Sequence, residues 1–366
     1  MMLYEYAAKE IFSQYGISIP RSFLTTDASG AGKLADEIGH VVLKAQVATG
    51  GRGKAGGILI AQNQHDVEVK ARSILGMSIK GLIVKKLLVE EYIRPEKEMY
   101  LGITIDRKVR CPIIMASSEG GVDIEEVART SPEKIKNMHI HTLTGLHDCQ
   151  ARELAYFLNK GEEAQISEII RKLYRVFTEN DCTLAEINPL ALTENGFIAL
   201  DAKMNIDDNA MFRQKFIEEE DDTPTSTARK NGMSYVGLDG DIGCIVNGAG
   251  LAMATLDMIK HYGGEAANFM DVRAGANEEQ MKVALKLVSS NIKVRSILIN
   301  IFGGITKCDE VARGIIDSGV TLPIVIRLTG TNEEEGLRML EEHGLILVST
   351  SEEAAKEAVA LGHSHK

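Results

Sequence analysis

The clearest chemistry in this sequence lies in residues 44–57, which read KAQVATGGRGKAGG. The segment leaves an apolar, β-like run that ends at Leu43 and opens into a loop with five glycines. Glycines allow backbone N–H groups to approach a phosphate closely, and Lys44, Arg52 and Lys54 add positive charge beside them. The segment therefore predicts a phosphate-binding loop.

The loop departs from the Walker A motif at one position. That motif needs a hydroxyl after Gly-Lys to hold magnesium, and here Ala55 follows Gly53-Lys54. The alternative interpretation is a mobile glycine-rich hairpin on a basic surface.

A second group of polar residues lies on a predicted hairpin formed by residues 184–192 and 198–202. Glu186 and Asn188 are two residues apart, so they share a strand face, and Asp201 on the partner strand can approach Asn188. A carboxylate and an amide oxygen suit Mg²⁺, which keeps water or phosphate in its other positions. The alternative is that Asn188 and Asp201 are ordinary polar residues near a turn.

An acidic pair, Glu90-Glu91, ends another apolar strand. Its carboxylates could accept hydrogen bonds from an adenine amino group or from ribose hydroxyls, or they could belong to a solvated strand end. The sequence leaves both interpretations open.

Composition limits the kind of protein that carries these residues. The chain has 366 residues and a net charge of −11, which argues against general affinity for nucleic acid. It lacks an apolar run of about 18 residues, so we expect no membrane span. Its five cysteines are scattered without a CxxC pair, which favours reduced thiols and a cytoplasmic location.

An acidic run at 218–222, followed by small polar residues, divides the chain. We expect one region over residues 1–230 and a second over 231–366. In the second region strands and helices alternate, with predicted strands at 242–246, 267–270, 294–302, 322–328 and 345–348. This alternation predicts a parallel sheet covered by helices on both faces, with ligands at the carboxyl ends of the strands.

Glycine-containing turns follow four of these strands, at 247–250, 273–276, 303–306 and 329–332. Each turn precedes a predicted helix, whose first backbone N–H groups favour anions. These turns therefore predict an anion-binding edge on the sheet. The region lacks the full glycine spacing and the downstream acid of a dinucleotide-binding fingerprint.

Several motifs together resemble one family over essentially the whole chain and in the same order. They are residues 44–57, EMYLG at 98–102, SEGGVDI at 118–124, LAEINPL at 184–190, LDAK at 200–203, VNGAGLAM at 246–253 and NIFGGI at 300–305. The family is the β subunit of ADP-forming succinyl-CoA synthetase, or succinate–CoA ligase. The resemblance implies an α/β protein with an ATP-grasp N-terminal region followed by a flavodoxin-like parallel α/β domain.

The resemblance also implies residue roles. Those for the nucleotide are phosphate contacts by Lys44, Gly51, Arg52 and Gly53, and adenosine or ribose contacts by Glu90, Ile93 and Glu98. Asn188 and Asp201 match the Mg²⁺ ligands, and Glu186 matches a glutamate that steadies a phosphohistidine. Asn247, Gly304, Ile305 and Thr306 match contacts to the substrate carboxylate and to phosphate.

In this family the phosphohistidine and most of the CoA site belong to an α subunit. The resemblance therefore implies half of an enzyme, in an αβ or α2β2 assembly that acts on ATP or ADP, succinate and CoA in the citric acid cycle. The helix after Gly303-Gly304 would point its positive end at the partner's histidine.

Two positions bear on specificity. Arg273 stands where the family commonly has glycine, which makes another dicarboxylate such as malate an alternative substrate, and Pro20 resembles the ADP-forming members. Two other classes stay open: a flavin- or dinucleotide-binding module, and a nucleotide sensor without catalytic activity.

Overall fold

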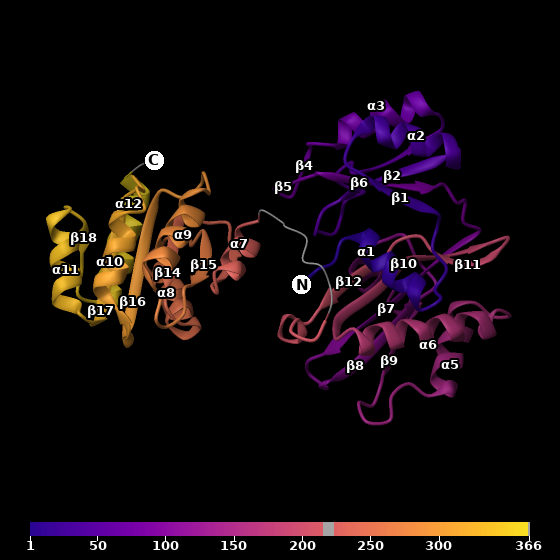
Figure 1. Cartoon of the computed structure of the whole chain (residues 1–366). Coiled ribbons are helices and arrows are strands. Elements are labelled where there is room, and N and C mark those ends of the chain that lie inside the picture. The colour runs from indigo at the N-terminus through magenta and orange to yellow at the C-terminus, as the bar shows by residue number, and fades with distance from the viewer. Residues whose placement is uncertain (215–222, 365–366) are drawn as a thin grey trace. The chain divides into compact units, whose positions relative to one another are not determined.

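The computed structural model describes residues 1–214 and 223–364, which belong to two compact units (Figure 1). Unit 1 is Met1–Ile217 and unit 2 is Glu218–Lys366. The predicted acidic connector at 218–222 lies outside the described residues. The helix α7 (Pro224–Lys230) packs with unit 2, because its Ala228 belongs to the same core as Met233 and Tyr235. The structural division therefore precedes the expected boundary at residue 230.

Unit 1 contains two antiparallel sheets, a small hairpin and six helices of four residues or more among its described residues. Their bounds are α1 (Glu5–Gln14), β1 (Ser22–Thr25), α2 (Ala28–Ile38), β2 (Val41–Gln46), β3 (Ile58–Ala61), α3 (Gln64–Ile74), β4 (Ser78–Ile79), β5 (Leu82–Ile83), β6 (Lys86–Glu91), β7 (Lys97–Asp106), β8 (Cys111–Ser117), α4 (Ile124–Thr130), β9 (Ile135–His139), α5 (Asp148–Leu158), α6 (Glu163–Glu179), β10 (Cys182–Thr193), β11 (Gly196–Ala199) and β12 (Lys203–Ile206).

The first sheet of unit 1 has the strand order β1-β6-β2-β3. Apolar residues of β2 and β6, such as Leu43 and Leu87, pack with Val67 of α3 in one core. The helices α2 and α3 begin at Asp27 and Asn63, whose side chains accept hydrogen bonds from backbone N–H groups of the first turn. The strands β2 and β3 pair antiparallel on either side of the glycine-rich loop.

The second sheet has the order β11-β10-β7-β8-β9, with β12 also paired to β10. The helix α6 is amphipathic, and its apolar residues join the core of this sheet with residues of α1 and α5. The structure confirms the predicted hairpin β10–β11, and β7 and β8 form another hairpin. However, β11 ends at Ala199, so Asp201 lies in the connection to β12 and not on the predicted strand.

Unit 2 is a single six-stranded sheet with helices on both faces. Its remaining elements are β13 (Ser234–Gly237), β14 (Ile242–Val246), α8 (Ala249–His261), β15 (Asn268–Asp271), α9 (Glu278–Ser289), β16 (Ser296–Lys307), α10 (Cys308–Ile316), β17 (Ile324–Thr331), α11 (Glu333–Glu342), β18 (Ile346–Leu347) and α12 (Ser351–Ser364).

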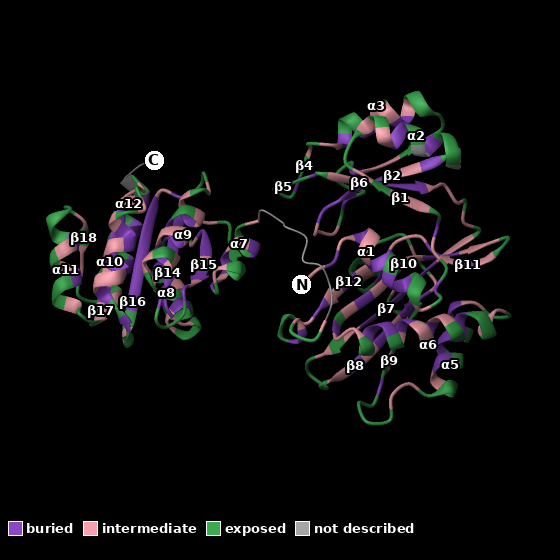
Figure 2. Cartoon of the chain, viewed as in Figure 1, coloured by how far each residue is buried: buried purple, intermediate pink, exposed green. Residues whose placement is uncertain are grey.

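The strand order of unit 2 is β13-β15-β14-β16-β17-β18. Its five parallel strands therefore follow the order 2-1-3-4-5, which confirms the predicted flavodoxin-like topology. The long central strand β16 is largely buried, as Figure 2 shows, because helices cover it on both sides. The antiparallel edge strand β13 was not predicted.

Among the described parts of the chain, no helix combines the length and the apolar character needed to cross a bilayer. The five cysteines are free, and Cys182, Cys244 and Cys308 are buried as expected of small core residues, whereas Cys149 is exposed.

Candidate active site

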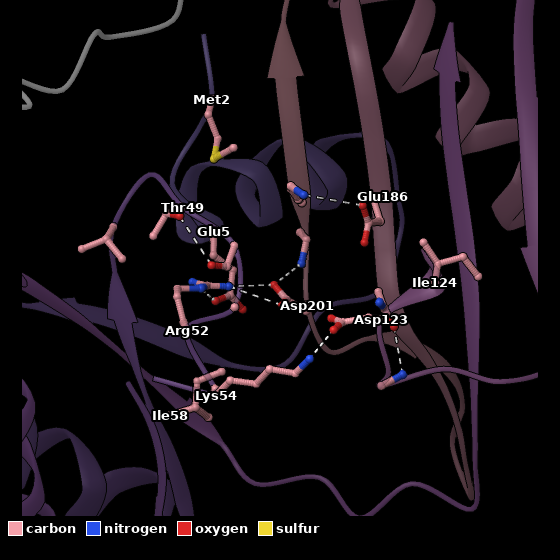
Figure 3. Close-up of a pocket in the computed structure, with 18 of the residues that line it drawn as sticks. Met2, Glu5, Thr49, Arg52, Lys54, Ile58, Asp123, Ile124, Glu186 and Asp201 are labelled. Carbon is pink, nitrogen blue, oxygen red and sulfur yellow. Dashed lines mark hydrogen bonds and ion pairs between the residues drawn. The ribbon is translucent and has the colours of Figure 1, made fainter. Parts of the chain in front are cut away.

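A cavity of about 770 Å³ lies in unit 1 (Figure 3). The glycine-rich loop lines it with residues 49–54, and further lining comes from the loop at 121–125, from Glu186 and Asn188 on β10, and from residues 201–203. The first residues of the chain also reach it, through Met2, Leu3 and Glu5. The two groups of polar residues recognised in the sequence therefore meet in one cavity.

The expected Mg²⁺ ligands both face this cavity. The Asn188 side-chain oxygen accepts a hydrogen bond from the Gly121 N–H at 2.8 Å, and its amide nitrogen donates to the Val122 carbonyl at 3.0 Å. The Asp201 carboxylate accepts from Arg52 Nη2 at 3.1 Å and from the Ala202 N–H at 2.8 Å.

An amide oxygen and a carboxylate are a donor set that fits Mg²⁺. Within the described residues, no three His, Cys, Asp or Glu side chains gather into a fuller metal site. A two-ligand set is nevertheless what Mg²⁺ uses when nucleotide phosphates and water complete its coordination.

Glu186 lines the same cavity, and only 16% of its side-chain surface is exposed. Burial raises the pKa of its carboxyl group above the ordinary value, while Lys203, whose Nζ lies 4.0 Å away, acts in the opposite direction. Lys203 is brought there by the pairing of β12 with β10, where the two residues are direct neighbours. The sequence had not identified Lys203 as part of the site.

The glycine-rich loop places Gly51, Arg52 and Gly53 along the cavity, and their contacts to nucleotide phosphate stay predictions. Arg52 is fixed there because its guanidinium group contacts both Glu5 Oε2, at 2.6 Å, and Asp201 (Figure 3). Lys54 forms an exposed ion pair with Asp123. Lys80 also lines the cavity, at the tip of the β4–β5 hairpin.

Beneath the loop lies a buried ion cluster formed by Glu5, Lys9, Lys44 and Glu90. The Lys44 ammonium group contacts Glu5 Oε1 at 2.9 Å and Glu90 Oε1 at 2.7 Å, and it donates to the Leu200 carbonyl. Although burial alone would lower it, these carboxylates raise the pKa of Lys44. Lys44 and Glu90 thus form an ion pair with each other and are not among the residues that line the cavity.

No motif or spacing in the sequence indicates that Glu5 and Lys9 belong to this cluster. Their i, i+4 spacing on α1 is typical of an exposed helix pair. Their place in the site is evident only from the structure, in which α1 packs against residues near 200. The periodicity of the sequence does not predict that long-range contact.

The two remaining predicted nucleotide contacts, Ile93 and Glu98, are not among the residues that line the described cavity. Glu98 is half-buried, and burial raises the pKa of its carboxyl group. Its carbonyl accepts a hydrogen bond from the Gly120 N–H, next to the residue that bonds Asn188. Their contacts to adenosine or ribose stay predictions.

The ion cluster leads to a testable expectation for Glu5. Although burial alone would raise it, the attraction of Lys44, Lys9 and Arg52 holds the pKa of Glu5 well below its ordinary value. Its contribution to stability is therefore present above the pKa of the unfolded chain and is lost as pH falls through the depressed folded value. We expect Glu5→Gln to lower the free energy of unfolding by about 3–5 kcal/mol at pH 7, because it leaves the three buried cations of Lys9, Lys44 and Arg52 with only two carboxylates.

Urea unfolding at several pH values measures this effect. The difference between Glu5→Gln and the wild type should shrink in acid, as the wild-type carboxylate becomes protonated. Glu10→Gln, on the exposed side of the same helix, is the matched control and should change stability by less than about 0.5 kcal/mol. A Glu5→Gln protein as stable as this control would contradict the expectation.

In unit 2, two of the residues that match substrate and phosphate contacts, Asn247 and Thr306, are hydrogen-bonded to each other. Asn247 donates to the Phe302 carbonyl at 3.0 Å and to Thr306 Oγ1 at 3.3 Å, and its oxygen accepts from the Phe302 N–H. Both residues are buried, whereas Gly304 and Ile305, which directly precede Thr306 in β16, are exposed. Asn247 and Thr306 therefore hold the backbone that presents Gly304 and Ile305.

Two of the predicted glycine turns differ from expectation. Residues 303–306 lie inside β16, and 329–331 lie inside β17, because the two strands continue to pair past Gly303 with an irregularity before Lys307. The turns at 247–250 and 273–276 do lead into helices, as predicted.

The turn after β15 contains Arg273 in a left-handed backbone conformation, with a φ of 62°. Asp271 stabilises this turn because its carboxylate accepts hydrogen bonds from the Arg273 N–H at 2.7 Å and from the Gly248 N–H at 2.6 Å. Glycine adopts such a φ most readily. The arginine side chain is exposed at this edge of the sheet.

Comparison with known proteins identifies the parts of this architecture. Residues 2–192 match the family model of an ATP-grasp domain, and residues 245–361 match that of a CoA-ligase. An ATP citrate lyase from Methanothrix soehngenii, solved with citrate and coenzyme A, shares the fold with a TM-score of 0.69 at 19% identity, over 99% of both chains. The predicted ATP-grasp region is thereby confirmed.

Curated relatives match along the whole length. The chain is 48% identical to the succinate–CoA ligase [ADP-forming] subunit beta of Roseiflexus sp., over 100% of both chains. It is 44% identical to the subunit of the same name from Bacillus subtilis, over 99% of this chain and 100% of that one. The chain belongs to the family of β subunits of ADP-forming succinate–CoA ligases, which are acid–thiol ligases.

Proposed function

We propose that this chain binds MgATP or MgADP in the cavity of unit 1 and, with an α subunit, couples the cleavage of succinyl-CoA to the phosphorylation of ADP. The observation that carries the proposal is the meeting, in one cavity, of the glycine-rich loop with the oxygen ligands Asn188 and Asp201 and the buried carboxyl group of Glu186. The free, scattered cysteines are consistent with a cytoplasmic location, and a role in the citric acid cycle is part of this proposal.

The nucleotide phosphates would lie along Gly51, Arg52 and Gly53, where backbone N–H groups and one guanidinium group meet them. Asn188 and Asp201 would hold the Mg²⁺, which neutralises phosphate charge when it is bound. Lys44 adds positive charge below the loop. Glu90, Ile93 and Glu98 are proposed to contact adenosine and ribose.

Phosphoryl transfer then needs an acceptor on the partner. None of the nine histidines of this chain falls in a motif that suggests a phosphohistidine. We propose that a histidine of the α subunit accepts the γ-phosphoryl group from ATP and that Glu186 accepts a hydrogen bond from its imidazole ring. The phosphoryl group moves on to a succinate carboxylate, and the CoA thiol displaces phosphate from succinyl phosphate to give succinyl-CoA.

Unit 2 would serve the acid substrate and phosphate. The proposed contacts are Asn247, Gly304, Ile305 and Thr306, and the helix α10 would present its N-terminus to the phosphorylated histidine of the partner. Acidic residues in the first turn of α10, Asp309 and Glu310, reduce its positive potential. The exposed segment Gly304–Ile305 therefore carries the main contacts.

A β subunit of malate–CoA ligase is a second candidate, and Arg273 is the observation that favours it. Its guanidinium group is exposed at the edge where the substrate carboxylate is proposed to bind. An added cation there would suit an acid with an additional hydroxyl group.

The release of ADP from MgATP, CoA and succinate tests these proposals. We expect turnover by the complex that this chain forms with its α subunit and none by the chain alone. Turnover of malate without succinate would support the second candidate. MgATP binding without turnover in any complex would contradict both and favour a nucleotide sensor.

A further inference from the structure

We infer that Lys9 is a positioning residue of the nucleotide site, and that it acts as the cation which stays with the buried carboxylates when nucleotide phosphate attracts Lys44. This inference rests on the proposed function. Lys9 lies on α1 and is 1% exposed, far too buried to meet the nucleotide itself.

Lys9 and Lys44 contact the same three acceptors. Lys9 Nζ lies 2.9 Å from Glu5 Oε1 and 2.8 Å from the Leu200 carbonyl, and it also pairs with Glu90. Lys44 Nζ lies 2.9 Å from the same Glu5 oxygen, 2.7 Å from the other Glu90 oxygen and 2.5 Å from the Leu200 carbonyl. If one lysine moves away, the other can therefore still pair with Glu5 and Glu90 and donate to the Leu200 carbonyl.

The charges around these lysines balance. Three carboxylates, of Glu5, Glu90 and Asp201, face three cations, of Lys9, Lys44 and Arg52. A triphosphate in the cavity attracts the cations of Lys44 and Arg52. Without Lys9, the turn of Lys44 toward phosphate would leave Glu90 buried without a cation, which costs more than the new contact provides.

Lys9 also acts on the proposed metal ligand through the backbone. The Leu200 carbonyl, which accepts from both ammonium groups, immediately precedes Asp201. Two charged hydrogen bonds fix the peptide from which the Asp201 carboxylate extends toward the cavity. One side chain on α1 thus supports both the phosphate-binding cation and the proposed Mg²⁺ ligand.

The test compares MgADP binding by calorimetry in the wild-type full chain, Lys9→Met and the charge-balanced double variant Lys9→Met/Glu5→Gln. The double variant removes one cation and one anion, so it stays folded if the single variant does not. We expect both to bind MgADP at least about tenfold more weakly than the wild type, since supporting residues typically contribute about 10–100-fold. Lys9→Arg should recover part of the affinity, and the exposed Lys33→Met should bind as the wild type does.

Kinetics of the complex with the α subunit separate positioning from general damage. The KM for ATP should rise in the double variant, while the KM values for CoA and succinate stay within about twofold. A double variant with wild-type MgADP affinity would overturn the inference, because Lys9 would then serve only charge balance in folding. A wild-type chain that binds no MgADP would overturn the proposed function, and this inference with it.

Discussion

Replacing Asp201 with asparagine is expected to reduce turnover of the complex by about a hundredfold or more, the scale seen when one group that stabilises transition-state charge is removed. Asp201 is the one anionic oxygen in the proposed Mg²⁺ ligand pair, and about a third of its side-chain surface is exposed. Asparagine keeps the shape and an oxygen but loses the charge that holds a divalent cation. ADP release at saturating substrates measures the loss.

Two further observations would identify the cause of that loss. Excess Mg²⁺ should recover part of the activity of Asp201→Asn, because weaker ligation is opposed by mass action. Asp123→Asn, which removes a carboxylate from the same cavity rim but not from the proposed ligand pair, should change turnover by less than about threefold. Full activity of Asp201→Asn would exclude Asp201 as a metal ligand.

Replacing Glu186 with glutamine is expected to reduce phosphorylation of the α subunit from labelled ATP by about a hundredfold, with MgADP affinity changed by less than about threefold. An ionised carboxylate orients an imidazole ring and stabilises its cationic form, which glutamine does not. The separation of transfer from binding is the signature of a residue that faces the acceptor and not the nucleotide. Equal losses in both would place Glu186 among the nucleotide contacts.

The same substitution has an opposite effect on stability. Because burial raises the pKa of Glu186 in the folded chain, the native state loses stability as pH rises from the pKa of the unfolded chain toward that raised value, and the loss is constant above it. Glutamine removes this penalty. The Tm of Glu186→Gln relative to the wild type should therefore increase from mildly acidic to neutral pH, while Glu194→Gln, exposed at the tip of the β10–β11 hairpin, should show no such trend.

The sequence predicted the elements that repeat a local pattern. The alternation of strands and helices in unit 2 was enough to predict a parallel sheet, because parallel strands need crossover helices, whereas its flavodoxin-like order was implied by the family resemblance. The edge strand β13 was missed since a short antiparallel edge has no such pattern. The hairpin carrying Glu186 was predicted, but the position of Asp201 past the end of β11 depends on how β12 pairs with β10.

The site divides in the same way. Residues in one continuous motif, such as Gly51 and Arg52, were found because their spacing is itself the signal. Lys203 and Lys80 reach the cavity through pairing and a tight turn, and Glu5 and Lys9 through packing of α1. The buried ion pair between Lys44 and Glu90 could not be predicted either, because the cluster that holds it is built from three segments distant in sequence.

The ion cluster makes the order of chain synthesis matter. Lys9 is translated before its acceptor at Leu200, which lies 191 residues later. Until that stretch has emerged from the ribosome, Lys9 and Lys44 lack the Leu200 carbonyl that both contact, and Arg52 lacks Asp201. Closing so long a loop is slow relative to local hairpins and helices. Nucleotide binding should therefore be the last property that nascent unit 1 acquires, and immobilised ADP would retain only chains released with both ends of this unit in place.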